Sequence, residues 1–132
     1  VKEKQMYTPK LFISCPMNGL TDEMIKANRE KMHKIAEIVF DKKLEVIPSY
    51  IIPAGEVPEG AMTPLWCLGR SIQMMSEADY YIGVNAFYDY DYPGCVIENN
   101  VAHNYGLRAY FVDSSILNLP KKDLKYEKDN IK

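Results

Sequence analysis

One stretch of the chain, residues 78–112, predicts a strand, a loop, a helix and a second strand in that order. Residues 80–84 form a short apolar run with two tyrosines, which is typical of a strand covered on both faces. A helix is expected over about residues 95–105, and residues 109–112 predict a second buried strand. A helix that connects two strands in this way forms a crossover, so the two strands should be parallel.

The N-terminal half shows the same alternation of strand and helix. Thr21 and Thr63 are expected to cap two helices there, because a threonine hydroxyl accepts a hydrogen bond from the free backbone N–H groups of the first turn. The alternation predicts a flavodoxin-like, doubly wound α/β domain of three layers, with a parallel sheet of four to five strands between helices. The expected elements are strands over about residues 10–15 and 44–47 and helices over about residues 22–40 and 64–77.

Length and composition are those of a single domain. The chain has 132 residues, of which 47% are hydrophobic, and we expect a core over about residues 10–119 with 120–132 as a candidate flexible tail. A net charge of -2 indicates neither nucleic acid nor an anionic membrane as a partner, and no apolar run is long enough to cross a bilayer. The 3 cysteines lack C-x-x-C spacing, which favours neither a disulfide framework nor a zinc site and indicates a reducing cytoplasm.

A single carboxylate, Glu98, stands where a ligand is expected. Ligands of such folds bind beyond the carboxyl ends of the strands, where the 85–94 loop and the first turn of the next helix should lie. We expect Glu98 on that first turn. A carboxylate there stabilises a helix by about 0.3–1 kcal/mol without further function. It also suits a nucleophile, because free backbone N–H groups favour its charged form.

Several familiar phosphate and nucleotide sites are absent from the sequence. Cys15 follows the first strand as in the Cys-x5-Arg phosphatases, but the position of the arginine holds Thr21. The chain has neither the GxxxxGK[ST] phosphate loop nor the GxGxxG dinucleotide motif. The connection over residues 48–63 contains three prolines and two glycines, and its length predicts a binding loop or lid.

One spacing resembles a known family. The pattern G-x3-E-x3-A-x3-G over residues 94–106, preceded by Ala-Asp at 78–79, resembles the nucleoside 2-deoxyribosyltransferases and their nucleotide N-glycosidase relatives. The sequences FISCPMNG at 12–19 and PLWxLG at 64–69 resemble a phage and bacterial branch of that family. The resemblance covers about residues 10–112.

This resemblance implies cleavage of an N-glycosidic bond. The glutamate that matches Glu98 would attack the anomeric carbon of a nucleoside or nucleotide and hold the sugar as a covalent ester. A second base or water would then take the sugar, in a double displacement like that of retaining glycosidases. The resemblance also implies a small-molecule substrate, no metal or redox cofactor, and a homo-oligomer in which a neighbour completes the pocket.

Further residues are candidates for binding the substrate beside this glutamate. Asn18 and Gly19 can offer amide donors, and Asn85 is placed to orient the carboxylate or a hydroxyl. Tyr50 or Trp66 can stack on a base, although Trp66 suits the core equally well. The candidate substrate-binding residues are Met17, Asn18, Gly19, Tyr50, Trp66, Ser71, Asn85, Asp91, Tyr92 and Gly94.

The chain departs from the family at one position. Relatives place an aspartate about two turns before the Ala-Asp pair to protonate the leaving base, and that position here holds Ser71. Serine is a poor general acid. Asp79 is expected at the wrong end of its strand, whereas Asp89 and Asp91 lie on the loop near the site.

Two other classes of function therefore remain open. A nucleotide-binding module would use Glu98 only to hold a ribose hydroxyl, for sensing or sequestration, and Ser71 favours this alternative. A structural or assembly protein would use Tyr88, Tyr90 and Tyr92 as an exposed contact surface. The intact spacing from Gly94 to Glu98 favours the enzyme.

Overall fold

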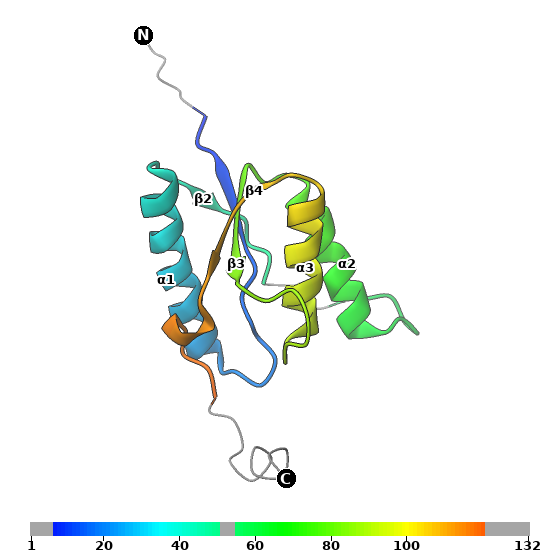
Figure 1. Cartoon of the computed structure of the whole chain (residues 1–132). Coiled ribbons are helices and arrows are strands. Elements are labelled where there is room, and N and C mark those ends of the chain that lie inside the picture. Colours follow the sequence, from blue (N-terminus) through cyan, green and yellow to red (C-terminus); the bar gives the residue numbers. More distant parts are fainter. Residues whose placement is uncertain (1–6, 51–54, 121–132) are drawn as a thin grey trace.

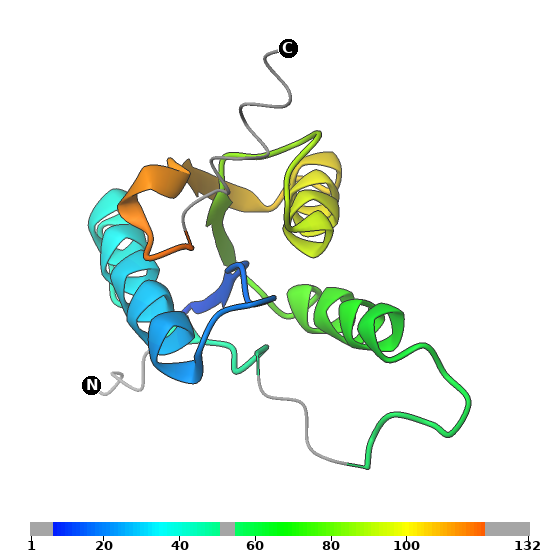
Figure 2. The ribbon, with the colours of Figure 1, turned by 90° about the horizontal axis from the view of Figure 1, so that it is seen from below.

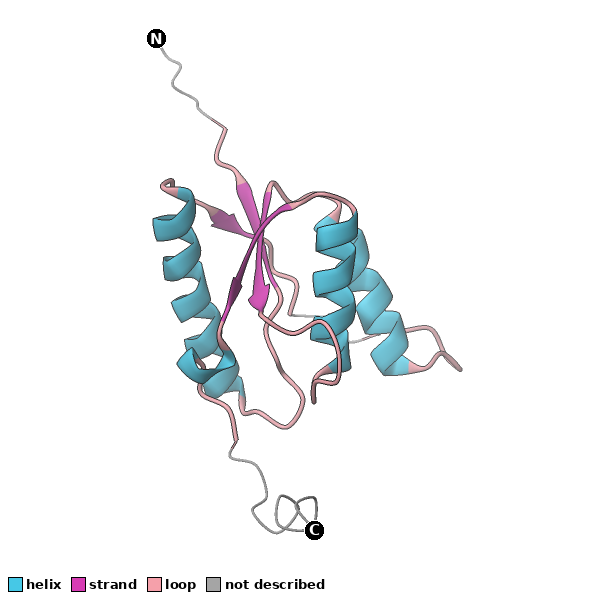
Figure 3. Ribbon diagram, in the orientation of Figure 1, coloured by secondary structure: helices cyan, strands magenta, loops and turns pink. Residues whose placement is uncertain are grey.

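The computed structural model describes residues 7–50 and 55–120. Its strands are β1 (Lys10–Ile13), β2 (Glu45–Val46), β3 (Tyr80–Val84) and β4 (Arg108–Val112). They form one sheet in the order β2-β1-β3-β4, and all the pairings are parallel. This order brings β1 and β3 together at the centre of the sheet (Figures 1 and 3). The predicted flavodoxin-like α/β fold is confirmed.

Helices cover both faces of the sheet. They are α1 (Asp22–Phe40), α2 (Thr63–Met75) and α3 (Pro93–Asn104), followed after β4 by the short 3-10 helix η2 (Ser114–Ile116). Figure 2 shows α1 and η2 on one face and α2 and α3 on the other. Asn28 of α1 fastens the segment after η2, since its side chain donates to Asn118 O at 3.1 Å and accepts from Asn118 N at 2.7 Å.

The two faces of the sheet bury separate hydrophobic cores. Successive strand residues point to opposite faces, so Leu11 and Ile13 of β1 pack on the α1 side whereas Phe12 packs on the side of α2 and α3. In β3 the same alternation sends Ile82 to the α1 side and Tyr81 to the other. Both central strands are therefore buried on both faces, as predicted for β3.

The helix starts agree only in part with the predicted ones. Thr21 caps α1 as expected, and its Oγ1 accepts a hydrogen bond from Met24 N at 3.1 Å. The predicted cap at Thr63 is wrong, because Met62 occupies the N-cap position of α2 without a side-chain hydrogen bond. Helix α3 begins at Pro93, before the expected start, because proline suits a first helical position. Glu98 consequently lies in the second turn of α3.

The predicted burial of the last strand is also wrong. β4 pairs only with β3 and lies at an edge of the sheet. Arg108 and Tyr110 are exposed, Ala109 and Phe111 are half-buried, and of the strand's residues only Val112 is buried. An edge strand is covered less completely than the central strands, and this explains the difference.

Parts of two predictions lie outside the described residues. These are 51–54 of the predicted binding loop and 121–132 of the predicted tail. Within the ranges 7–50 and 55–120, no helix combines the length and the apolar character that crossing a bilayer requires.

Candidate active site

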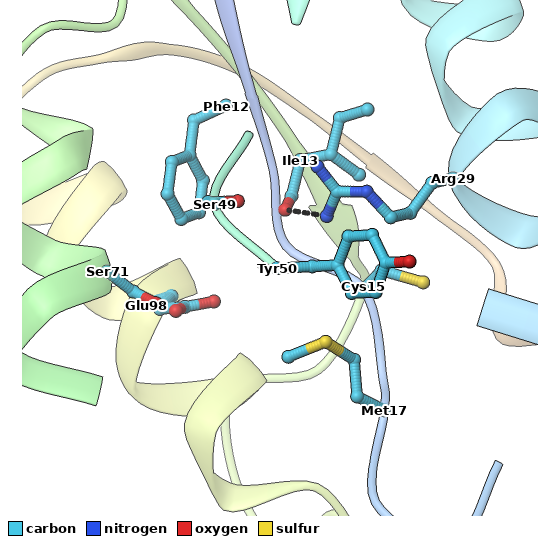
Figure 4. Close-up of a pocket in the computed structure, with 9 residues that line it drawn as sticks. All are labelled: Phe12, Ile13, Cys15, Met17, Arg29, Ser49, Tyr50, Ser71 and Glu98. Atoms are coloured by element: carbon cyan, nitrogen blue, oxygen red, sulfur yellow. Dashed lines mark hydrogen bonds between the residues drawn. The ribbon is translucent and has the colours of Figure 1, made fainter. Parts of the chain in front are cut away.

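A small pocket opens at the carboxyl end of β1. Its walls come from the sheet and from both helix layers (Figure 4). A cavity of about 20 Å³ lies between them, which is enough for a water molecule. The lining residues are Phe12, Ile13, Cys15, Met17, Arg29, Ser49, Tyr50, Ser71 and Glu98.

The carboxyl group of this pocket is fixed by two helices and a strand end. Glu98 reaches it from α3 and Ser71 from α2. Ser14, the residue after β1, donates its hydroxyl hydrogen to Glu98 Oε1 at 2.6 Å. Ala102, one turn further along α3, is fully buried and lets the helix lie close to the sheet. The Glu98 side chain therefore has a defined position at the edge of the sheet.

Burial raises the pKa of Glu98 to about 7, against the hydrogen bonds from Ser14 and Ser71 and the charge of Arg29. We expected the opposite direction, with the charged form favoured by the helix N-terminus. That expectation is wrong, because Glu98 lies beyond the first turn with its free N–H groups and, although the residue as a whole is half-buried, its carboxyl group is largely withdrawn from water. A carboxyl group with this pKa is present in both forms at neutral pH, which suits a nucleophile or a general acid.

Asn99, the next residue on α3, fastens this helix to the end of β3. Its side chain is fully buried, and its Nδ2 donates to the carbonyls of Val84 and Ala86 at 2.5 and 2.8 Å. Its Oδ1 accepts a hydrogen bond from the Tyr81 hydroxyl. We predicted that Asn85 would orient the pocket carboxylate, but Asn85 is exposed and does not line the pocket. Asn99 instead positions that carboxylate by holding its helix.

A buried arginine lies on the α1 side of the pocket. Arg29 is only 9% exposed, and its Nη1 and Nη2 donate to the carbonyls of Ile13 and Ile47, both at 3.3 Å. The Tyr50 ring lies against the guanidinium, with 5.2 Å between Cζ and the ring centroid. A positive charge is thereby held at the ends of the first two strands (Figure 4).

The structure brings some of the predicted site residues together and leaves others apart. Those that line the pocket are Met17, Tyr50, Ser71 and Glu98. Trp66 is half-buried on α2 and belongs to neither hydrophobic core. A Cβ atom at Gly94 would meet nothing within 4 Å, so there is open space beside this residue. The predicted residues that do not line the pocket are Asn18, Gly19, Trp66, Asn85, Asp91, Tyr92 and Gly94.

Sequence reasoning missed two of the polar residues around Glu98. Arg29 follows the buried Ile25 by four positions and precedes the buried Met32 by three, so helical spacing alone places it on the core face of α1. Ser14 directly follows the apolar run of β1, and a small polar residue at a strand end is a signal for a site.

The buried cysteines are unsuited to nucleophilic attack. Burial raises the pKa of Cys15 to about 11 and that of Cys95 to about 12. Both thiols are therefore protonated at neutral pH. In the described part of the chain, no three side chains of His, Cys, Asp or Glu gather as a metal site would require.

Asp79, Tyr88 and Tyr90 do not line the pocket. Asp79 accepts hydrogen bonds from the Tyr7 hydroxyl at 2.7 Å and from Lys10 N at 2.9 Å, at the amino edge of the sheet. This confirms that Asp79 lies at the amino end of its strand, away from the pocket that Glu98 lines. Tyr88 is 83% exposed, but Tyr90 packs against the core on the α1 side. Tyr90 therefore does not contribute to the predicted exposed tyrosine surface.

The pocket thus combines one carboxyl group of raised pKa, one buried cation and the hydroxyl groups of Ser49, Tyr50 and Ser71. Such a set can attack an electrophilic carbon and bind the group that leaves it. Comparisons of the chain with protein-family models, with curated proteins and with solved structures gave no match.

Proposed function

We propose that this protein cleaves the N-glycosidic bond of a nucleoside or nucleotide, with Glu98 as the nucleophile. The observation that carries the proposal is the position of this carboxyl group. It lines the pocket at the carboxyl edge of the sheet, accepts a hydrogen bond from Ser14 and is withdrawn from water. The same residue stands in the spacing that resembles the nucleoside 2-deoxyribosyltransferases.

The proposed reaction has two displacements. A carboxylate oxygen of Glu98 forms a bond to the anomeric carbon while the bond from that carbon to the base nitrogen breaks. The resulting sugar ester is then attacked by water, or by a second base in a transfer reaction. Ser14 keeps the carboxylate oriented for the attack through its hydrogen bond to Oε1.

Substrate must enlarge the pocket as it binds. The present cavity of about 20 Å³ is far smaller than the roughly 300 Å³ or more of ordinary ligand pockets. Met17 lines it and is 41% exposed on the turn after β1. An unbranched, flexible methionine can swing outward, and this would open the site towards solvent.

One alternative function is favoured by a specific observation. Glu98 is the only carboxyl group among the described lining residues, and Ser71 stands where relatives have an acid. A nucleotide-binding module for sensing or sequestration needs no leaving-group acid. In that case Glu98 would hold a sugar hydroxyl without forming a bond to carbon.

A chromatographic assay separates the enzyme from the binding module. The protein is incubated with ribo- and deoxynucleosides and their 5′-monophosphates, with and without a second free base. Release of base supports hydrolysis, and exchange only with added base supports transfer. After acid quenching, intact mass measurement should show a chain that carries one sugar, and digestion followed by peptide mass analysis should place that sugar on the peptide that contains Glu98. Tight calorimetric binding without release would instead support the binding module.

The pH dependence of base release follows from the raised pKa of Glu98. Only the ionised carboxylate attacks carbon, so kcat/KM should rise about tenfold per pH unit below neutrality and level off above about pH 7. The measurement is the initial rate of base release at low substrate concentration across this range. A rate that falls through the same midpoint would make Glu98 a general acid and exclude it as the nucleophile.

Ser14→Ala provides the variant that should move this midpoint. The Ser14 hydroxyl stabilises the ionised form of Glu98 and holds its pKa down. Its removal should shift the midpoint upward by about one pH unit. Ser76→Ala is the matched control, because Ser76 Oγ donates to Gln73 O at the end of α2 and makes no contact with the pocket.

The expected homo-oligomer gains support from one helix. The start of α2 exposes large apolar side chains, with Met62 68% and Leu65 62% exposed, and only Met75 of this helix is buried. A second copy of the chain would cover this surface. Light scattering over a range of concentrations tests the proposal, and a constant monomer mass would refute it.

A further inference from the structure

The described residues of this pocket include no second carboxyl group that could protonate the leaving base. Glu98 is the only carboxyl group among the described lining residues, and as the nucleophile it is ionised when the reaction begins. The other polar neighbours include the hydroxyl groups of Ser49, Tyr50 and Ser71. Serine hydroxyl groups are poor general acids at neutral pH, and a tyrosine hydroxyl is a weaker acid than a carboxyl group, so a cation that stabilises the departing base would assist the reaction.

Arg29 has the charge and the free hydrogen-bond donors for that task. A guanidinium carries five N–H donors and stays charged in proteins. Two of the five donate to the Ile13 and Ile47 carbonyls, and none of the ion pairs among the described residues includes Arg29. The charge of Glu98 acts on this guanidinium, but no carboxylate among the described residues forms an ion pair with it, so its remaining donors can bind an anion that enters the pocket.

Arg29 and Glu98 are placed as a displacement requires, with the nucleophile on one side of the reacting carbon and the group that binds the leaving base on the other. Helix α1 covers one face of the sheet and α3 the other, so Arg29 and Glu98 reach the pocket from opposite sides of β1 (Figures 2 and 4). In a displacement by a carboxylate, the leaving group departs from the side of the carbon opposite to the nucleophile. A sugar carbon in front of Glu98 therefore turns its base towards Arg29 and the Tyr50 ring.

We infer that Arg29 binds the departing base and stabilises it as an anion, so that the site prefers bases whose glycosidic nitrogen is acidic. This inference rests on the proposed function and adds the substrate class to it. Oxopyrimidines such as uracil leave as a delocalised anion whose carbonyl oxygens can accept from a guanidinium. Adenine, which leaves readily only after protonation, should be a poor substrate.

The electrons and protons of this step balance without a further reactant. An oxygen of Glu98 forms the bond to the anomeric carbon, and the electron pair of the carbon–nitrogen bond passes to the base. The base leaves as its conjugate anion beside Arg29 and takes a proton from solvent after release. Water then attacks the sugar ester, gives its hydroxyl group to the sugar and a proton to solvent, and returns the Glu98 carboxylate.

The test compares leaving bases of similar shape and different acidity. The substrates are the deoxyribosides, or the 5′-monophosphates, of uracil and of the more acidic 5-fluorouracil. Arg29→Gln should lower the release of uracil by about 100-fold and that of 5-fluorouracil distinctly less, because a better leaving group needs less stabilisation. An equal loss for both substrates would show that Arg29 acts only on the fold and would overturn the inference.

Two further variants serve as controls for this comparison. Lys34→Gln removes a positive charge from the exposed face of α1, where the Lys34 side chain is 73% exposed, and should leave the ratio of the two rates unchanged. Arg29→Lys keeps the charge and should fold if Arg29→Gln does not, as circular dichroism will show. Arg29→Lys should have the same ratio of 5-fluorouracil release to uracil release as the wild-type protein. If this ratio grows several-fold although the charge is kept, the inference is contradicted.

A binding experiment keeps the inference separate from the proposed function. Free uracil and 5-fluorouracil are titrated calorimetrically at one alkaline pH at which mainly the fluorinated base is an anion. The wild-type protein should bind 5-fluorouracil at least several-fold more tightly, and Arg29→Gln should lose this preference. If the wild-type protein releases no base, the proposed function fails, while this titration still decides whether Arg29 binds an anionic base. Equal affinity for both bases would overturn the inference.

Discussion

Replacing Glu98 by glutamine is expected to abolish base release almost completely. Glutamine has the same shape and can still accept the hydrogen bond from Ser14, which is 2.6 Å long in the wild-type protein. It cannot form the sugar ester, so the rate should fall by at least about 1,000-fold. Rates are measured with saturating substrate, and calorimetry should show that the variant still binds the substrate within a few-fold of the wild-type affinity.

The same variant should be more stable than the wild-type protein, but only at higher pH. Below pH 4.5, the ordinary pKa of the group, the carboxyl group is protonated in both the unfolded and the folded state. Between pH 4.5 and about 7 the unfolded chain releases this proton while the folded chain keeps it, so wild-type stability declines. Above that range, Glu98→Gln should raise the free energy of unfolding by about 2–3 kcal/mol.

Urea denaturation at an acidic and at an alkaline pH measures this effect. A gain confined to the alkaline measurement, together with lost activity, would show that the half-buried Glu98 carboxylate costs stability when charged and that the reaction depends on it. Base release that survives in Glu98→Gln would remove this residue from the mechanism. An equal change of stability at both pH values would mean that the carboxyl group is not withdrawn from water.

The elements around the site were predictable because their signals are local. The alternation of strand and helix and the threonine at position 21 gave the layers of the fold and the cap of α1. The rule that ligands bind at the carboxyl ends of strands placed Glu98 at the correct edge of the sheet. Each of these predictions depends on a few neighbouring residues or on the topology alone.

The electrostatics of the site were not predictable in the same way. Ser14 and Glu98 are separated by 84 positions, and Arg29 reaches the carbonyls of Ile13 and Ile47 over 16 and 18 positions. Such contacts arise only when the layers pack together. The pKa of Glu98 depends on that packing, and a reading of the helix N-terminus alone gave the wrong direction.

The second large effect is expected from a methyl group at Gly83, in the middle of β3. A Cβ atom there would collide with Asn99 Oδ1 and lie 2.9 Å from Tyr81 Cε1. Both side chains are fully buried, so neither can move into solvent. Gly83→Ala should lower the free energy of unfolding by about 3–4 kcal/mol, through crowding and through loss of the Asn99 hydrogen bonds. The melting temperature should fall by roughly 10–15 °C.

Gly69→Ala is the matched control for this substitution, since a Cβ atom at Gly69 meets nothing within 4 Å and the position lies inside α2. It should leave stability unchanged or raise it by up to about 1 kcal/mol. A melting temperature of Gly83→Ala within about 3 °C of the wild type would mean that α3 can move away from the sheet at little cost.

The added methyl group should also affect the site. Because Asn99 adjoins Glu98 on α3, any shift of α3 away from the sheet would displace the carboxylate. Base release should therefore fall in Gly83→Ala even at temperatures where the variant is folded, whereas Gly69→Ala should retain it.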